Sequence, residues 1–100
     1  MLEILDDIDD DFRLLIVELE SKGDNKSAEI LVFNKNKLSS VVLDCVDKFT
    51  KERVEQLTLL SDTLESYKQK AVGLKELDDV VKDTCFSFAV DKKRFFGDIK

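Results

Sequence analysis

Apolar residues recur at helical spacing near the beginning of the chain. Over residues 2–21, the step from one to the next alternates between three and four positions. This spacing places them on one side of an α-helix and leaves the charged residues on the other side. The residues of this stripe are Leu5, Ile8, Phe12, Leu15 and Leu19. The polar residues 21–27, which include Gly23, are typical of a loop, so we predict an amphipathic helix over residues 2–21.

The next segment, residues 28–49, is compatible with two structures. Its apolar residues fit a helical stripe, but they also fit two strands around the turn Asn-Lys-Asn-Lys at 34–37. The strands would give an α+β fold with a small hairpin in residues 28–44. The turn lacks the glycine that tight hairpins favour, so the sequence favours the helix and leaves the hairpin as an alternative. The stripe residues are Ile30, Leu31, Leu38, Val41, Val42, Cys45, Val46 and Phe49.

A helix start is indicated at Thr50. Threonine is a good N-cap residue, and Glu52 would lie in the first turn, where its charge is favourable. Phe49 and Val54 have the spacing of a hydrophobic staple across such a cap. We therefore predict that a helix begins directly after Thr50.

From Leu57 onward, a heptad-like pattern continues for more than four repeats. Ten positions alternate steps of three and four without interruption, and only Asp78 among them is not apolar or aromatic. Lys68 and Lys70 before Gly73 would fit a helix that ends there. Because the pattern crosses Gly73 without a change of phase, we predict one long helix through this position. It is either coiled-coil-like or an ordinary bundle helix with a broad apolar face. The ten positions are Leu57, Leu60, Leu64, Tyr67, Ala71, Leu74, Asp78, Val81, Cys85 and Phe88.

These patterns predict a single all-α domain over residues 1–100. The chain contains no proline and three glycines, and 43% of its residues are hydrophobic, which suits long helices around a packed core. Depending on whether the helix continues through Gly73, the domain would be a three- or a four-helix bundle. Residues 84–100 mix strand-like and basic-aromatic features, and the sequence assigns them no structure.

Acidic residues are concentrated at the beginning of the chain. The formal net charge is −6, and the six carboxylates of residues 1–11 account for all of it, because 16 acids and 16 bases remain elsewhere. We interpret this acidic patch as the hydrated face of the first helix. A calcium loop starting at Asp7 is an alternative, but Phe12 occupies the position that requires glycine. The patch consists of Glu3, Asp6, Asp7, Asp9, Asp10 and Asp11.

Most standard catalytic and metal-binding sites are excluded by composition. The chain has no histidine, its two cysteines are forty positions apart, and its isolated glycines form no phosphate-binding loop. We therefore expect no enzyme activity, no cofactor and no metal, and two free buried thiols. An acidic N-terminal segment and no long apolar run predict a cytoplasmic protein, or a nuclear one if the source is eukaryotic.

A protein-binding function remains after these exclusions. We expect a small acidic helical interaction module, either an adaptor, a dedicated chaperone or an inhibitor, that binds another protein or itself through a helix face. The alternative is an acidic DNA-mimic inhibitor of a nucleic-acid-binding protein. Neither direct nucleic-acid binding nor membrane binding is expected, since three adjacent cations are too few. The candidate partner-binding residues are Leu57, Leu60, Leu64, Tyr67, Leu74 and Val81 on the stripe, and Lys92, Lys93, Arg94, Phe95 and Phe96 at the basic end.

The basic end itself has two interpretations. The stretch Lys92–Phe96 could bind an acidic partner, or it could be a solvated turn whose two phenylalanines pack on the core.

Overall fold

The computed structural model describes residues 3–43 and 49–96 of the chain. These residues form four helices, which confirms the all-α prediction. They are α1 (Glu3–Ser21), α2 (Asn25–Leu43), α3 (Lys51–Lys68) and α4 (Leu74–Phe96). The helix predicted over residues 2–21 is confirmed by α1, and the hairpin alternative for residues 28–44 is wrong because α2 is helical up to Leu43.

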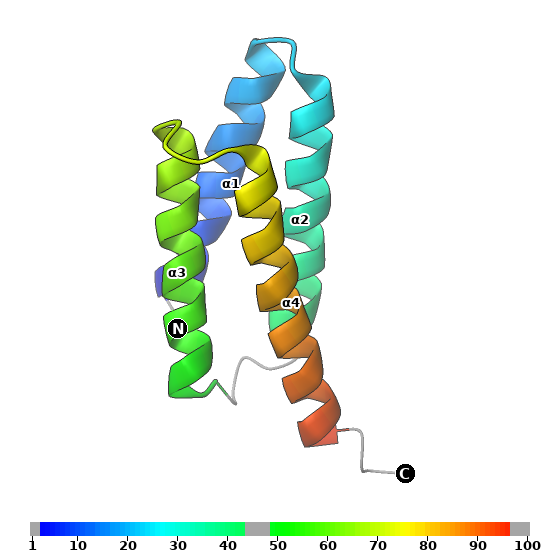
Figure 1. The fold of residues 1–100 in the computed structure, drawn as a ribbon. Coiled ribbons are helices and arrows are strands. Elements are labelled where there is room, and N and C mark those ends of the chain that lie inside the picture. Colours follow the sequence, from blue (N-terminus) through cyan, green and yellow to red (C-terminus); the bar gives the residue numbers. More distant parts are fainter. Residues whose placement is uncertain (1–2, 44–48, 97–100) are drawn as a thin grey trace.

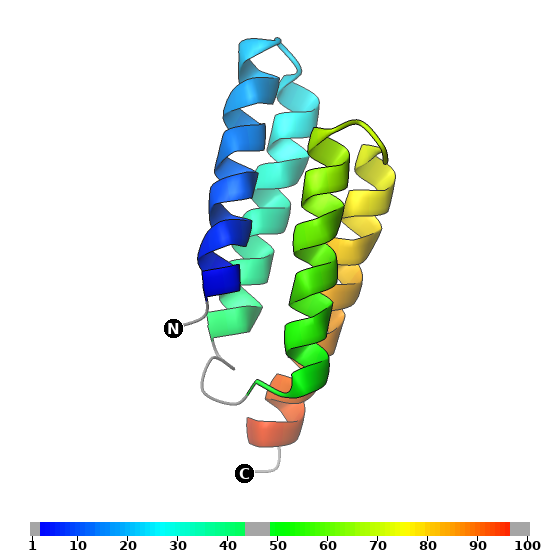
Figure 2. The ribbon, with the colours of Figure 1, turned by 90° about the vertical axis from the view of Figure 1, so that its left-hand side faces the viewer.

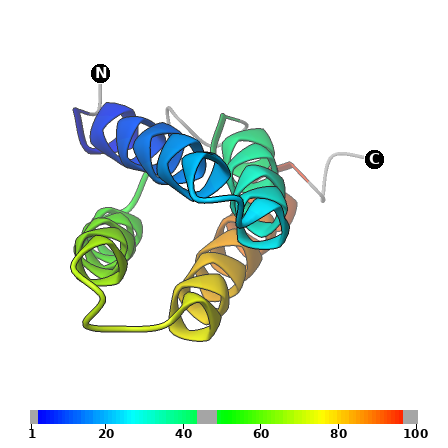
Figure 3. The same cartoon turned by 90° about the horizontal axis from the view of Figure 1, so that it is seen from above.

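The four helices alternate in direction and form two antiparallel hairpins, α1–α2 and α3–α4 (Figure 1). Seen along the bundle, α1 lies next to α2 and α3, and α4 lies next to the same two helices (Figure 3). The hairpins therefore pack through two parallel pairs, α1 with α3 and α2 with α4. Helices α2 and α3 follow each other in the chain but lie diagonally opposite each other. This order decides which helix faces share a side of the molecule.

The prediction of one long helix through Gly73 is wrong, because α3 ends at Lys68 and α4 begins at Leu74. Lys70 has a left-handed conformation (φ 64°), which stops the helix before the glycine is reached. Gly73 instead lies directly before α4 and caps its beginning: its N–H donates to Glu76 Oε2 (2.8 Å) and its carbonyl accepts from the Leu77 N–H (3.3 Å). Most stripe residues on both sides of the turn are buried in one core. Next to the turn the pattern is not followed, because Ala71 is exposed and Leu77, rather than Asp78, is buried near the beginning of α4.

The helix start at Thr50 is confirmed. Thr50 is extended and its side-chain oxygen accepts a hydrogen bond from the backbone N–H of Arg53 (3.2 Å). Phe49, directly before the cap, packs on the core with its ring 5.2 Å from that of Phe88 in α4. The staple between Phe49 and Val54 stays a prediction. Cys45 and Val46, which extended the stripe of the preceding segment, lie outside the described residues.

One hydrophobic core runs through the bundle and contains residues from all four helices. The sequence-predicted stripe of α1 contributes Ile8, Phe12 and Leu15, while Leu5 and Leu19 pack at its edge. The buried members from the other helices are Leu31, Leu38, Val42, Leu57, Leu60, Leu64, Leu77, Val81, Cys85 and Phe88. Cys85 is a free buried thiol, as predicted, whereas Cys45 is not described.

The two hairpins are displaced along the bundle axis (Figures 1 and 2). The turn between α1 and α2 extends beyond the turn between α3 and α4, and at the other end α4 extends beyond its neighbours. The beginning of α1 and the end of α4 lie at the same end of the molecule (Figure 1). The bundle is consequently elongated, with principal extents of 48, 23 and 22 Å.

Candidate functional site

The order of the helices gives the bundle two electrically different sides. Helix α1 carries eight acids and one base, and α3 carries four acids and three bases. Helix α2 carries three bases and one acid, and α4 carries five of each. Since α1 packs beside α3 and α2 beside α4, one side of the bundle is strongly acidic and the opposite side is slightly basic. The sequence alone does not reveal this division, because it depends on which helices are neighbours.

The acidic side is built from two helices that are far apart in the sequence. A shallow depression between α1 and α3 is lined by Asp7, Asp10, Asp11, Ser61, Asp62 and Glu65. Partial burial raises the pKa of Asp11, Lys68 opposes this effect, and Glu65, Asp7 and Asp10 add to it. The acids of α3 therefore enlarge the patch that the sequence placed in residues 3–11.

The six predicted acids do not share one environment. Glu3, Asp6, Asp7 and Asp10 are exposed, as expected for a hydrated helix face, whereas Asp9 and Asp11 are partly buried. Asp9 lies 3.0 Å from Arg13 Nε and 3.4 Å from Lys35 Nζ on α2.

The calcium-loop alternative required residues 7–18 to form a loop, but these residues are helical within α1. No group of three or more acidic or cysteine side chains is placed to hold a metal ion in the part of the chain that the structure describes.

The opposite side carries a strongly exposed aromatic pair. Phe33 on α2 is 63% exposed and Phe86 on α4 is 70% exposed. An open groove lies between these two helices. We use the name α2·α4 face for this groove and Phe33 together. The groove is lined by Lys37, Val41, Lys82, Asp83, Cys85, Phe86 and Ala89. The Lys37 ammonium lies 6.0 Å from the centre of the Phe33 ring, at the outer limit of a cation–π contact.

The thiol at the floor of this face is not an activated nucleophile. Burial raises the pKa of Cys85, and the nearby Lys37 only partly opposes the effect. A raised pKa leaves less thiolate near neutral pH, so the groove offers apolar surface rather than nucleophilic chemistry.

The stripe residues predicted to bind a partner lie within the chain's own core. Leu57, Leu60, Leu64 and Val81 are at most 1% exposed, and Tyr67 and Leu74 are partly buried against them. The four buried residues are therefore not accessible to a partner of the folded monomer, whereas Tyr67 and Leu74 keep part of their surface exposed. The physical reason is the turn at Lys70, which folds the two halves of the stripe against each other and against α1 and α2.

The basic end lies on the last turns of α4, apart from the centre of the stripe. Lys92, Lys93 and Arg94 are exposed there, while the side chains of Phe95 and Phe96 lie outside the described part of the structure. The stretch Lys92–Phe96 is therefore helical, so the interpretation as a turn is wrong. Binding of an acidic partner and packing of the two phenylalanines stay predictions.

Sequence reasoning did not identify Phe33 and Phe86 as site residues. The available signal was that neither residue falls on its helix's apolar stripe, so neither was needed for the core. A large aromatic residue at such a position is a candidate contact residue, although isolated exposed apolar residues are common.

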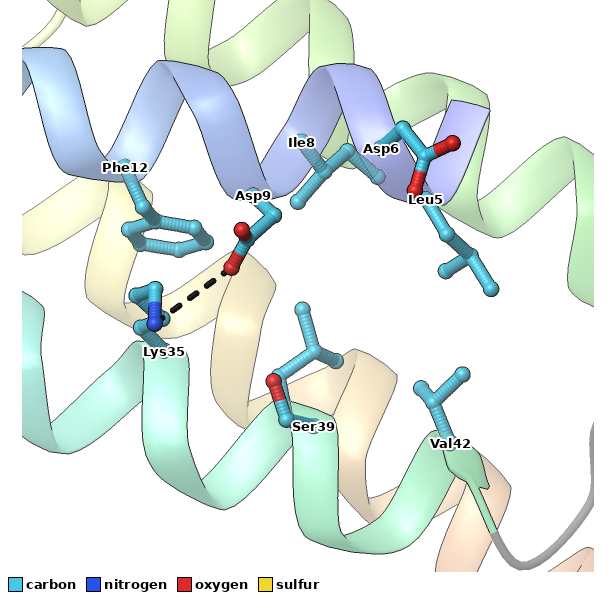
Figure 4. Close-up of a pocket in the computed structure, with 9 residues that line it drawn as sticks. Leu5, Asp6, Ile8, Asp9, Phe12, Lys35, Ser39 and Val42 are labelled. Carbon is cyan, nitrogen blue, oxygen red and sulfur yellow. Dashed lines mark ion pairs between the residues drawn. The ribbon is translucent and has the colours of Figure 1, made fainter. Parts of the chain in front are cut away.

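A further hollow lies between α1 and α2 and has a volume of about 220 Å³. Leu5, Ile8, Phe12, Leu38 and Val42 supply its apolar surface, and Asp6, Asp9, Lys35 and Ser39 supply its polar surface. Figure 4 shows these side chains converging from both helices, with the Asp9–Lys35 ion pair bridging the gap. The volume is smaller than the roughly 300–1,000 Å³ typical of small-molecule sites. It suits an inserted side chain better than a cofactor.

Comparisons with known proteins found no family model, no curated protein and no solved structure that matches this chain. No helix of residues 3–43 and 49–96 combines the length and hydropathy needed to cross a membrane.

Proposed function

We propose that this protein is a small helical interaction module that acts by binding a partner protein through the α2·α4 face. The observation that carries the proposal is the pair Phe33 and Phe86, two exposed aromatic residues on adjacent parallel helices. Phe86 lines the groove, and Phe33 lies 6.0 Å from the ammonium of Lys37, which also lines it. Aromatic residues are enriched at the energetic centres of protein interfaces, where they fill complementary pockets. The module would serve as an adaptor, a dedicated chaperone or an inhibitor, and we propose no catalytic role.

Charge favours this face over the acidic side for self-association. Two copies that met through their α1·α3 sides would bring many carboxylates together, which is unfavourable. The α2·α4 side carries mixed charges with a small basic excess, so two such faces can meet with little repulsion. A second copy is therefore the first partner to test, and a different protein with an apolar patch is the next. We further propose that the protein acts in the cytoplasm, or in the nucleus if the source is eukaryotic.

The test combines Phe33→Ser and Phe86→Ser in one variant. The matched control is Leu14→Ser with Leu59→Ser, because these residues on α1 and α3 are 59% and 56% exposed and lie outside the groove. Sedimentation velocity over a wide concentration range and affinity capture from the native host should both show loss of binding only for the phenylalanine variant. If the two variants bind to the same extent while their melting temperatures stay unchanged, the proposal is contradicted.

A second candidate is an acidic inhibitor that mimics nucleic acid. It is favoured by one observation: Asp62 and Glu65 of α3 extend the acidic surface beyond the first helix. A mimic must oppose many cations of a nucleic-acid-binding groove, and a larger acidic area does so better. Replacing Asp7, Asp10 and Asp62 by Asn would then abolish competition with DNA for a basic target protein, whereas the phenylalanine variant would compete normally.

A further inference from the structure

The groove between α1 and α2 contains two apolar hollows, one toward each end. The first is the hollow of about 220 Å³ drawn in Figure 4, between the N-terminal half of α1 and the C-terminal half of α2. The second, of about 310 Å³, lies near the turn that joins the same helices and is lined by Glu20, Asn25, Ala28, Glu29 and Val32. Val32 is 39% exposed at the second hollow, and Leu5 is only partly buried at the first, so apolar surface is accessible at both positions.

Both hollows are bordered by carboxylates. Asp6 and Asp9 line the first, and Glu20 and Glu29 line the second, whereas Lys35 is the one cationic residue among the side chains that line them. Lys35 and Arg13 both lie close to Asp9, so their charge is directed at that carboxylate. Asp6, Glu20 and Glu29 are exposed. A ligand that fits this groove therefore combines apolar side chains with positive charge, and an anionic ligand such as a fatty acid is disfavoured.

The spacing of the hollows restricts the shape of the ligand. Ala28 and Ser39 of α2 line the second and the first hollow, and they are eleven residues apart. At 1.5 Å per residue this separation is about 16 Å, or roughly three helical turns. Ala28 and Ser39 therefore lie on the same side of α2. A partner helix lying along the groove would place two side chains of its own at the same separation.

We propose that the α1·α2 groove binds a basic amphipathic helix of a partner protein. Two apolar side chains of that helix, three turns apart on one face, occupy the two hollows, and lysine or arginine residues beside them face Asp6, Glu20 and Glu29. This is the helix-in-groove mode of recognition, with the anchors setting specificity and the charges assisting association. The proposal uses a different surface from the α2·α4 face and does not depend on it.

The probe is a synthetic lysine-rich helical peptide that carries a leucine and a phenylalanine three turns apart. Comparison peptides have the same composition in scrambled order, glutamate in place of lysine, or alanine in place of both anchors. Binding is measured by fluorescence anisotropy at several salt concentrations, and the contact surface by amide chemical shifts. We expect saturable binding of the first peptide alone, with shifts confined to α1 and α2.

Two pairs of variants test the hollows. Ser39→Phe fills the first hollow, while Ser40→Phe places the same side chain on an exposed neighbouring position outside it. Affinity should fall about tenfold or more for Ser39→Phe, as expected when an anchor pocket is blocked, and should be unchanged for Ser40→Phe. Val32→Lys should weaken binding in the same way, with Val17→Lys as its exposed control on α1. The second pair keeps the test decisive if Ser39→Phe does not fold.

The contribution of charge is tested with Asp6→Asn and Glu29→Gln against Asp62→Asn on α3. The groove variants should reduce both the affinity and its dependence on salt, and the control should not. The proposal is overturned if the scrambled peptide binds equally well, because general attraction to an acidic protein would then explain the binding. It is also overturned if both members of each variant pair behave alike, or if the amide shifts map to α1·α3 or to α2·α4.

Discussion

In each of the two hairpins, the first helix ends with the same pattern of backbone hydrogen bonds. The residue that adopts the left-handed conformation after that helix differs between them. After α1, the Asp24 N–H donates to the Leu19 carbonyl (2.9 Å), and Gly23 is left-handed with φ 81°. After α3, the Ala71 N–H donates to the Ser66 carbonyl (2.8 Å), and the left-handed residue is Lys70 with φ 64°. Both turns have the bond pattern of a Schellman motif.

The difference shows that the same turn forms without glycine at the left-handed position. Glycine adopts a left-handed conformation at little cost, whereas a residue with a Cβ atom does so at roughly 1–2 kcal/mol. The second hairpin can sustain that cost because its two helices bury many core residues, including Leu60, Leu64 and Leu77.

The hairpins also differ in the polar contacts between their helices. In the second hairpin, Arg53 of α3 binds the buried Asp91 of α4 through two bonds, Nε–Oδ2 of 2.7 Å and Nη2–Oδ1 of 3.2 Å. In the first hairpin, the ion pair of Lys35 with Asp9 is longer, at 3.4 Å, and Asp9 is less buried. Helix α2 also contains Asn34, which is only 2% exposed and whose Nδ2 has no hydrogen-bond partner among the described residues.

The largest expected effect comes from breaking the ion pair of the second hairpin. Asp91→Ala should lower the free energy of unfolding by about 3 kcal/mol, because the Arg53 guanidinium is left partly buried without its partner. Asp9→Ala in the first hairpin should cost about 0–1 kcal/mol, as for a more exposed pair. Urea denaturation of both variants measures the contrast. Equal losses in the free energy of unfolding would mean that burial does not make the Arg53–Asp91 ion pair stronger than the Lys35–Asp9 ion pair.

The next effect concerns Asn34 in the first hairpin. Asn34→Leu should raise the free energy of unfolding by about 1–3 kcal/mol, since an unpaired buried amide is replaced by an apolar side chain of similar shape. The same denaturation measurement tests it, with Asn36→Leu as the exposed control on α2. A loss of stability would show that the Asn34 amide is satisfied in solution.

The two turns provide a prediction of intermediate size. Lys70→Gly should stabilise the protein by about 1 kcal/mol by relieving the left-handed lysine, and Gly23→Ala should destabilise it by a similar amount. Gly73→Ala should destabilise by about 0.5 kcal/mol, because alanine is a poorer N-cap than glycine and its Cβ would lie 2.9 Å from Glu76 Oε2. Melting temperatures of the three variants check the order. A stabilising Gly73→Ala would support a continuous helix instead.

The smallest effect concerns Asp11 on the acidic side. Partial burial raises the pKa of Asp11 above its ordinary value of 3.8, so the folded state binds its proton more tightly than the unfolded state does. The contribution of Asp11 to the free energy of unfolding is therefore most favourable at a pH below its ordinary pKa. This contribution is lost as the pH rises through the pKa that Asp11 has in the folded state. Asp11→Asn should raise the melting temperature near neutral pH but not in strong acid. An equal rise at both pH values would exclude this titration as the cause.

The sequence predicted the elements whose signals are local. The spacing of Ile8, Phe12 and Leu15 identified α1, and Thr50 identified the beginning of α3. These features depend on residues within one or two helical turns of each other, so periodicity and capping rules were sufficient.

The errors arose where tertiary structure overrides a local signal. Gly73 is a start residue rather than a stop residue, and nothing about Lys70 indicates a left-handed conformation before the helices are packed. The order of the helices around the core was equally inaccessible. It depends on which helix faces meet in three dimensions, so the α2·α4 face could not be assembled from Phe33 and Phe86 in the sequence.

The most direct measurement of the central claim is a series of amide NMR spectra recorded at increasing protein concentration, followed by addition of any captured partner. If the α2·α4 face is the contact surface, signals of Phe33, Lys37, Phe86 and Ala89 should shift or broaden together. Signals of the α1·α3 side, such as Asp7 and Asp62, should stay constant. Changes centred on the acidic side, or no change of the α2·α4 signals with either self-association or a captured partner, would contradict the proposal for the α2·α4 face.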